Sequence, residues 1–169
     1  MPEDENLGTI NAFWAHGNAV VIQHPNLLKD NYHADWGAHV QQESGENWFH
    51  FPITMLTYNM GYRMHGYKVH FVYKTEGAAF LTGLTVWDGH EKVFEVKDIK
   101  KSGSGGAHDE GGTFELPKPY HPFVRAGLLI SAKFEFNKGS SVIFRGAGVD
   151  CFTAVEPDGF RVYKKHAGI

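Results

Sequence analysis

The chain of 169 residues has the length of one ordinary domain, and its 42% hydrophobic and 14% aromatic residues suffice for a single large core. Its formal net charge of -3 comes from 16 basic and 19 acidic residues with no lysine or arginine run, which argues against a nucleic-acid surface or an anionic-membrane surface. The single cysteine, Cys151, cannot form an internal disulfide, so the core must hold the fold.

The N-terminus is acidic and lacks the apolar run of a secretory signal, and no stretch of about 18 apolar residues could span a membrane. We therefore expect a cytoplasmic protein, although a secreted form trimmed of its signal would read the same. Residues 1–8 are expected to be a flexible leader, and residues 9–169 a single domain.

The first third of the chain is predicted to contain short strands separated by turns. Pro25 ends the second of them, because proline donates no hydrogen bond to a ladder, and a turn or one helical turn follows. The expected extended segments are residues 10–16, 19–22, 32–40 and 47–53. In the last of these, alternation places Trp48, His50 and Pro52 on one face and Phe49, Phe51 and Ile53 on the other. Pro52 indicates an edge strand or a strand end.

The middle of the chain is predicted to hold a central hairpin over residues 67–89. Its two arms are apolar on both faces, which is typical of buried strands, and Gly77 can supply the positive φ of the turn. Residues 55–66 have no clean period and are expected to form a long aromatic loop that leads into the hairpin. Both ends of the hairpin are then expected on the same side of one sheet.

The last third is predicted to contain further strands around a flexible loop. The glycine-rich segment of residues 100–112 is expected to be a surface loop within one domain. The expected strands are residues 91–96, 113–116, 123–136, 141–152 and 160–163. Helix is nearly absent from these patterns. Many short strands with glycine, proline and asparagine turns indicate an all-β, antiparallel two-sheet sandwich of jelly-roll type, with a closed β-barrel as the alternative.

Several short motifs resemble a group of small bacterial all-β proteins of unknown function. They are the segments at residues 14–17 (WAHG), 35–37 (DWG), 47–50 (NWFH), 86–89 (VWDG), 127–131 (GLLIS) and 146–150 (GAGVD). They are scattered over nearly the whole chain. The resemblance implies one sandwich-like domain and implies no reaction.

Eleven histidines are the oddest feature of the composition, and they raise the question of a metal or acid-base site. No HxH, HExxH or paired-cysteine spacing occurs. His16, His50, His70 and His90 each lie near an aromatic residue and could converge in space. Core and surface histidines are the alternative, and we predict no metal and no cofactor.

Aromatic residues could instead form a platform on which sugar rings stack, with polar neighbours bonding to the hydroxyls. Three of the four tryptophans are expected in the core, whereas Tyr58, Tyr62 and Tyr67 are expected to be exposed. Cys151 is expected to be a small buried hydrophobic residue, because no nucleophile motif surrounds it.

Three functions stay open on this reasoning. The first is a non-catalytic, lectin-like protein that binds a glycan or another small molecule through loop aromatics. The second is a structural module that assembles into homo-oligomers, and the third is a small-molecule enzyme with a histidine-based site, so the sequence does not decide whether the protein is an enzyme. The predicted ligand-binding residues are Trp48, His50, Tyr62, Arg63, His65, Trp87, Asp88 and His90.

Overall fold

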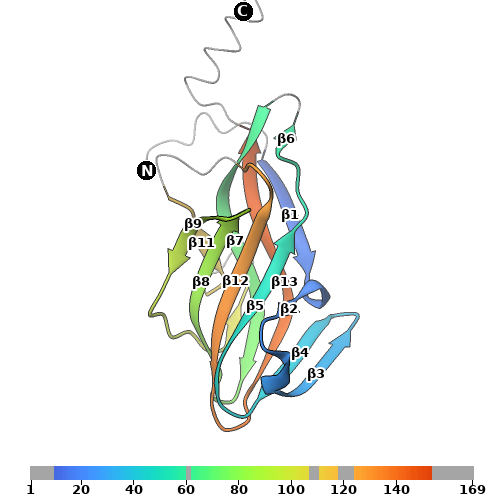
Figure 1. Cartoon of the computed structure of the whole chain (residues 1–169), viewed down its shortest axis with the longest axis vertical. Helices are drawn as coiled ribbons and strands as arrows, with labels where there is room; N and C mark the ends of the chain where they lie inside the picture. The colour runs from blue at the N-terminus through green and yellow to red at the C-terminus, as the bar shows by residue number, and fades with distance from the viewer. Residues whose placement is uncertain (1–9, 60–61, 107–110, 118–123, 154–169) are drawn as a thin grey trace, which may run out of the picture.

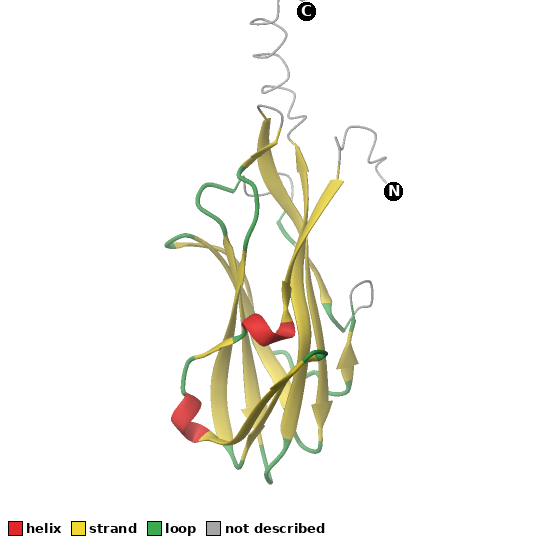
Figure 2. Ribbon diagram, turned by 90° about the vertical axis from the view of Figure 1, so that its right-hand side faces the viewer, coloured by secondary structure: helices red, strands yellow, loops and turns green. Residues whose placement is uncertain are grey.

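The computed structural model describes residues 10–59, 62–106, 111–117 and 124–153, which form two antiparallel sheets packed face to face (Figures 1 and 2). Apart from two short 3₁₀ turns, η1 (Gly17–Ala19) and η2 (Pro25–Leu27), these residues contain no helix. In particular, none of them lies in a helix long and apolar enough to cross a membrane.

Sheet A holds eight of the described strands. They are β1 (Ile10–His16), β3 (Leu28–Ala34), β4 (Gly37–Gln42), β6 (Tyr58–Asn59), β7 (Tyr62–Glu76), β10 (Ser104–Gly105), β11 (Thr113–Glu115) and β13 (Ser141–Thr153). Their main order is β10-β7-β13-β4-β3, with β1 beside β13 and both β6 and β11 beside β7.

Sheet B holds the other five described strands in the order β2-β5-β12-β8-β9. They are β2 (Val21–Ile22), β5 (Gly45–Ile53), β8 (Phe80–Asp88), β9 (Glu91–Val96) and β12 (Leu128–Phe136). Consecutive long strands change sheet, from β4 to β5, from β7 to β8 and from β12 to β13, as in a jelly roll. The predicted two-sheet sandwich is therefore confirmed, and the sheets do not close into a barrel.

The predicted central hairpin is wrong. β7 pairs with β13 in sheet A, whereas β8 pairs with β12 and β9 in sheet B, so residues 67–89 form an arch between the layers. Gly77 does turn the chain with φ +70°. The arms look alike in sequence because each strand sends apolar residues into the shared core. Alternation identifies faces and does not identify partners.

The two ends of this arch lie at the same end of the sandwich but in different layers. Residues 124–127 connect them: the Val124 N–H donates to the Met64 carbonyl of β7 at 2.8 Å. The following N–H groups of Arg125, Ala126 and Gly127 donate to the Asp88 carboxylate at the end of β8. Asp88 is thereby buried within a backbone clamp.

Two predicted loops are also partly wrong. The segment expected as an aromatic loop contains β6 and the start of β7, where Met64 and His65 are buried. The glycine-rich segment contributes β10, which pairs with β7 at Tyr73 and Lys74. The predicted leader (residues 1–8) and the predicted last strand (residues 160–163) lie outside the described residues.

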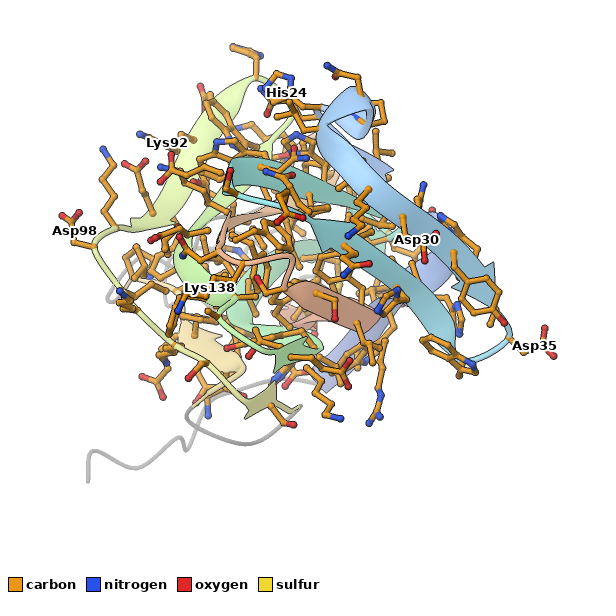
Figure 3. All side chains as sticks on the ribbon, turned by 90° about the horizontal axis from the view of Figure 1, so that it is seen from below. His24, Asp30, Asp35, Lys92, Asp98 and Lys138 are labelled. Atoms are coloured by element: carbon orange, nitrogen blue, oxygen red, sulfur yellow. The ribbon has the colours of Figure 1, made fainter. Side chains whose placement is uncertain are left out.

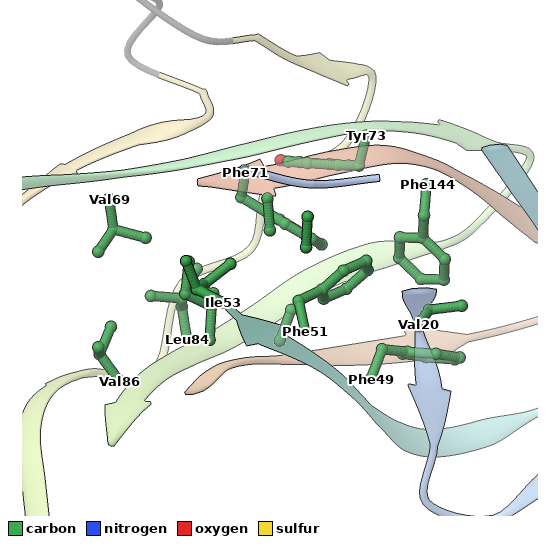
Figure 4. Packing of buried hydrophobic residues seen from close by; sticks show 14 of the residues in the cluster. Val20, Phe49, Phe51, Ile53, Val69, Phe71, Tyr73, Leu84, Val86 and Phe144 are labelled. Atoms are coloured by element: carbon green, nitrogen blue, oxygen red, sulfur yellow. The ribbon is translucent and has the colours of Figure 1, made fainter. Parts of the chain in front are cut away.

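The core between the sheets is built from inward-facing aromatic and aliphatic side chains (Figure 4). Phe144 of β13 contacts rings from both layers: its ring centroid lies 4.7 Å from Phe49 and 5.6 Å from Phe134 of sheet B, and 6.0 Å from Phe71 of sheet A. Removing one such side chain from water stabilises the fold by roughly 1.5–3 kcal/mol. Cys151 lies in this core as predicted, and burial raises the pKa of its thiol to about 12.

Candidate functional site

The outward-facing residues of sheet B form ordered rows across its strands. One row runs from Trp48 on β5 through Lys133 on β12 to Gly83 on β8. The next row runs from His50 through Ser131 and Thr85 to Glu95 on β9. Strand alternation places these side chains opposite the core, so the register sets their spacing.

A groove of about 420 Å³ lies over these rows, which is within the range of small-molecule sites. Its lining residues come from four strands and from the segment after β9. They are Glu46, Trp48, Thr82, Gly83, Thr85, Glu95, Val96, Lys97, Asp98, Ile99, Lys100, Lys133 and Glu135.

One wall of the groove is the segment of residues 97–100, which continues from β9 along the edge of β8. Asp98 turns the chain with φ +55°. Beyond it, Lys101 exchanges two backbone hydrogen bonds with Leu81, at 2.8 and 3.1 Å. The Lys100 ammonium lies 4.5 Å from the centre of the Phe80 ring, a cation–π contact. In the view along the sandwich, Asp98 marks this wall at the side opposite Asp35 and the β3–β4 turn (Figure 3).

The floor of the groove depends on the missing side chain of Gly83. A Cβ there would lie 3.3 Å from the Val96 carbonyl and 3.7 Å from the Cβ of Lys133. The half-buried ring of Trp48 lies two strands away in the same row. The groove thus combines an open floor with an aromatic side chain at one side.

Charges of both signs surround this floor. Lys133 pairs with Glu46 at 2.7 Å, and Glu95 pairs with Lys92 at 2.7 Å and with Lys97 at 3.2 Å. Lys92 and Lys97 hold the pKa of the Glu95 carboxyl below its usual range, and the hydrogen bond from Lys92 is the largest cause. The groove can therefore offer both hydrogen-bond donors and ionised acceptors to a ligand.

Three of the eight predicted binding residues share this face of sheet B. Trp48 lines the groove, and His50 lies in the adjacent row with its Nδ1 2.8 Å from the Ser131 hydroxyl. Burial lowers the pKa of His50, which favours its neutral form. Trp87 lies one row further on, opposite Leu129 and Lys92.

The other five predicted residues lie elsewhere. Tyr62, Arg63 and His65 belong to β7 of the opposite sheet; the Arg63 guanidinium lies 4.8 Å from the Tyr58 ring centre, and the buried His65 ring stacks on Phe152 at 5.4 Å. Asp88 is held in the backbone clamp, and His90 is exposed in the β8–β9 turn. The eight residues therefore do not form one site.

The predicted core position of three tryptophans is wrong. Trp14 and Trp36 are 43% and 47% exposed, and Trp48 and Trp87 are half-buried on outward-facing positions. The predicted exposure of Tyr58 is confirmed at 49%, while Tyr62 and Tyr67 are half-buried.

The four histidines that could have converged do not do so. His50 lies on the outer face of sheet B, whereas His70 belongs to sheet A, where its Nε2 is 2.8 Å from Asp150 and its Nδ1 is 3.1 Å from Thr113. The Nδ1 of His16 accepts the Asn18 N–H at 3.3 Å at the start of η1. Within the described ranges, no three His, Cys, Asp or Glu side chains are grouped to hold a metal ion.

Sequence reasoning missed the charged part of the groove. Lys133 and Glu135 were visible as polar positions alternating with apolar ones, and Glu46 precedes the Trp48 motif. Nothing in the spacing indicated that residues 97–100 run beside β8 and form a wall of the groove, because the course of such a segment depends on tertiary contacts.

No family model matches this sequence, and no relative was found among curated proteins. Solved structures that resemble this one include TmCBM61 in complex with β-1,4-galactotriose. The two share 16% sequence identity with a TM-score of 0.41, over 81% of this chain and 86% of that chain. A likeness of this size assigns no ligand to this protein.

Proposed function

We propose that the protein binds a carbohydrate in the groove on the outer face of sheet B. The observation that supports this most directly is the half-buried Trp48 beside a groove floor without a side chain, with donors and acceptors of both signs around it. The C–H face of a sugar ring packs on an indole, and its hydroxyls each need a polar partner.

The charge of the groove favours a neutral polyhydroxyl ligand. Three lysines and four carboxylates line it, so neither sign dominates. A phosphate-rich ligand would meet the carboxylates of Glu46, Glu95 and Glu135, and a cationic one would meet the three ammonium groups. The hydroxyl groups of a neutral sugar can donate to the carboxylates and accept from the ammonium groups.

The groove is also held in shape before any ligand arrives. The Glu46–Lys133 pair fixes one side, and the backbone bonds between Lys101 and Leu81 fix the other. Less side-chain freedom is then lost on binding, which improves affinity for a given set of contacts.

The test is calorimetric titration of the full chain with β-linked oligosaccharides of glucose, galactose, mannose and N-acetylglucosamine. Trp48→Ala is expected to weaken binding about tenfold or more, equivalent to about 1.4 kcal/mol. Trp36→Ala is the matched control, because Trp36 is similarly large, lies in the β3–β4 turn and is 47% exposed. Absence of binding to every sugar, or equal loss in both variants, would refute the proposal.

Lys133→Met tests the polar side of the groove. It keeps the apolar stem of the side chain and removes the ammonium that Glu46 holds at 2.7 Å. We expect weaker sugar binding with a nearly unchanged melting temperature, because an exposed ion pair contributes at most about 1 kcal/mol to stability. Unchanged affinity would remove Lys133 from the site.

We propose self-association through the β3–β4 hairpin as a second candidate function. In the described structure β3 pairs with β4 alone, and all residues from Lys29 to His33 are exposed. Tyr32, 53% exposed, lies with its ring 6.0 Å from that of Trp36. An exposed edge strand is a template for another strand. Sedimentation equilibrium should show a dimer that Tyr32→Lys dissociates; a monomer at all concentrations would refute this.

A further inference from the structure

The outer face of sheet A carries an aromatic surface that the groove does not use. Trp14 on β1 stands in one cross-strand row with Gly148, His70 and Thr113. A Cβ added to Gly148 would lie 2.5 Å from Cδ2, 2.7 Å from Cε2 and 2.8 Å from Cε3 of the indole. The ring therefore lies flat over the backbone of β13, which only glycine permits.

This geometry determines which part of the indole meets solvent. One face of the ring is pressed onto Gly148, so the exposed 43% of the residue comes from the opposite face and the edges. A tryptophan that served only to fill the core would bury both faces. Trp14 instead presents a flat apolar face outward.

The ring also contacts a buried histidine of β7. It stacks on His70 with centroids 5.7 Å apart and an interplanar angle of 14°. His70 is 1% exposed, and its two ring nitrogens are 2.8 Å from Asp150 and 3.1 Å from Thr113. The chain of contacts fixes the imidazole, which in turn fixes the indole, so little rotamer freedom remains for a ligand to remove.

Polar groups of both signs lie in the next row of the same face. That row contains Ala12, Asp150, Lys68 and Glu115, each two residues along its strand from the first row. The Asp150 and Lys68 side chains are 20% and 30% exposed, and Lys68 lies 3.7 Å from Glu115. Ala12 is too small to cover the indole, so the face stays open toward these groups.

We infer that this surface is a second carbohydrate site, in which a sugar ring stacks on Trp14 and its hydroxyls bond to Asp150 and Lys68. The lysine disfavours a cationic ligand, and the two carboxylates disfavour an anionic one. The inference stands on its own residues and does not require the groove. Because the two sites lie on opposite faces of the sandwich, a protein with both would cross-link multivalent glycans.

The experiment uses the full chain labelled with ¹⁵N in the tryptophan indoles. Single Trp→Phe variants assign the four N–H signals, and the oligosaccharide panel above is added at millimolar concentration. The Trp14 signal is expected to shift and saturate, while the Trp36 signal stays still although its exposure is similar. Lys68→Ala is expected to raise the dissociation constant read from this titration about tenfold, because a hydrogen bond to a charged group is lost.

The outcomes separate this site from the groove. A Trp14 titration that persists in Trp48→Ala supports a second site, and it does so even if the Trp48 signal never moves and the groove proposal fails. A Trp14 signal that no sugar moves overturns the inference. So does a Trp14 shift that Trp48→Ala abolishes, or one that Lys68→Ala leaves unchanged in a variant shown to be folded by circular dichroism.

Discussion

Replacing Asp88 by alanine should destabilise the protein and leave sugar binding intact. Asp88 is 5% exposed, and its carboxylate accepts three backbone N–H groups, from Arg125 at 2.8 Å, Ala126 at 2.9 Å and Gly127 at 3.2 Å. These bonds tie the end of β8 to the segment that enters β12, its neighbour in sheet B.

The magnitude follows from those three bonds. A hydrogen bond to a charged group contributes about 1.5–3 kcal/mol when buried, but water can reach donors on the exposed Arg125 and Ala126. We therefore take about 1 kcal/mol for each bond and expect Asp88→Ala to cost about 3 kcal/mol. For a chain of this size that lowers the melting temperature by roughly 6–12 °C. Asp88→Asn keeps one acceptor oxygen and should cost about half as much.

Urea unfolding followed by tryptophan fluorescence measures this loss as a lower midpoint with an unchanged m-value. Glu91→Gln is the matched control, because its partner is also Arg125 but the pair, at 2.7 Å, is half exposed on both sides. It should cost less than about 1 kcal/mol. The reasoning is refuted if Asp88→Ala is no worse than this control, or if it abolishes sugar binding in a fully stable protein.

Three further predictions concern the core and the outer face of sheet B. Phe144→Ala should lower the free energy of unfolding by about 3–5 kcal/mol, measured in urea, because the cavity would lie among rings of both sheets; a cost below about 1 kcal/mol would contradict the packing. The Cys151 thiol, with its pKa raised to about 12, should not react with a disulfide reagent at pH 8 until urea unfolds the chain. Burial lowers the pKa of His50 from 6.5, so the unfolded chain binds that proton first and stability should fall as the pH drops below about 6.5. The difference between the urea midpoints of the wild type and of His50→Gln should be smaller at pH 5.5 than at pH 7.5. An equal difference at the two pH values would contradict the assignment.

The sequence was sufficient to predict most strands and the sandwich, because period-2 alternation is a local property of the chain. Phe49 and Phe51 face inward and Trp48 and His50 outward, as their alternation predicts. Strand partners were not predictable in the same way. The arms of the arch at Gly77 have the pattern of a hairpin, and only packing against β13 and β12 decides that they belong to different sheets.

The candidate sites were less predictable for a related reason. A residue on an outward-facing position of a strand is recognisable, but the row that it joins depends on the register with strands far away in sequence. The bulge in β8, where Lys133 pairs with Gly83 and Phe134 with Leu81, reverses the alternation and cannot be read from residues 80–88 alone. Trp14 can be recognised as a candidate binding residue only once its indole is known to lie on the backbone of Gly148.

The repeated change of sheet between consecutive strands also constrains how the chain acquires its structure. β12 lies in the middle of sheet B between β5 and β8, and β13 is the strand on which β1, β4 and β7 all pair in sheet A. Neither layer can be completed from the N-terminal half alone, so the first strands must wait for the synthesis of residues 128–153. Such non-local pairing is slow. During translation the early apolar strands would remain without their partners, and their exposed apolar faces and unpaired edges would be open to aggregation until those partners emerge.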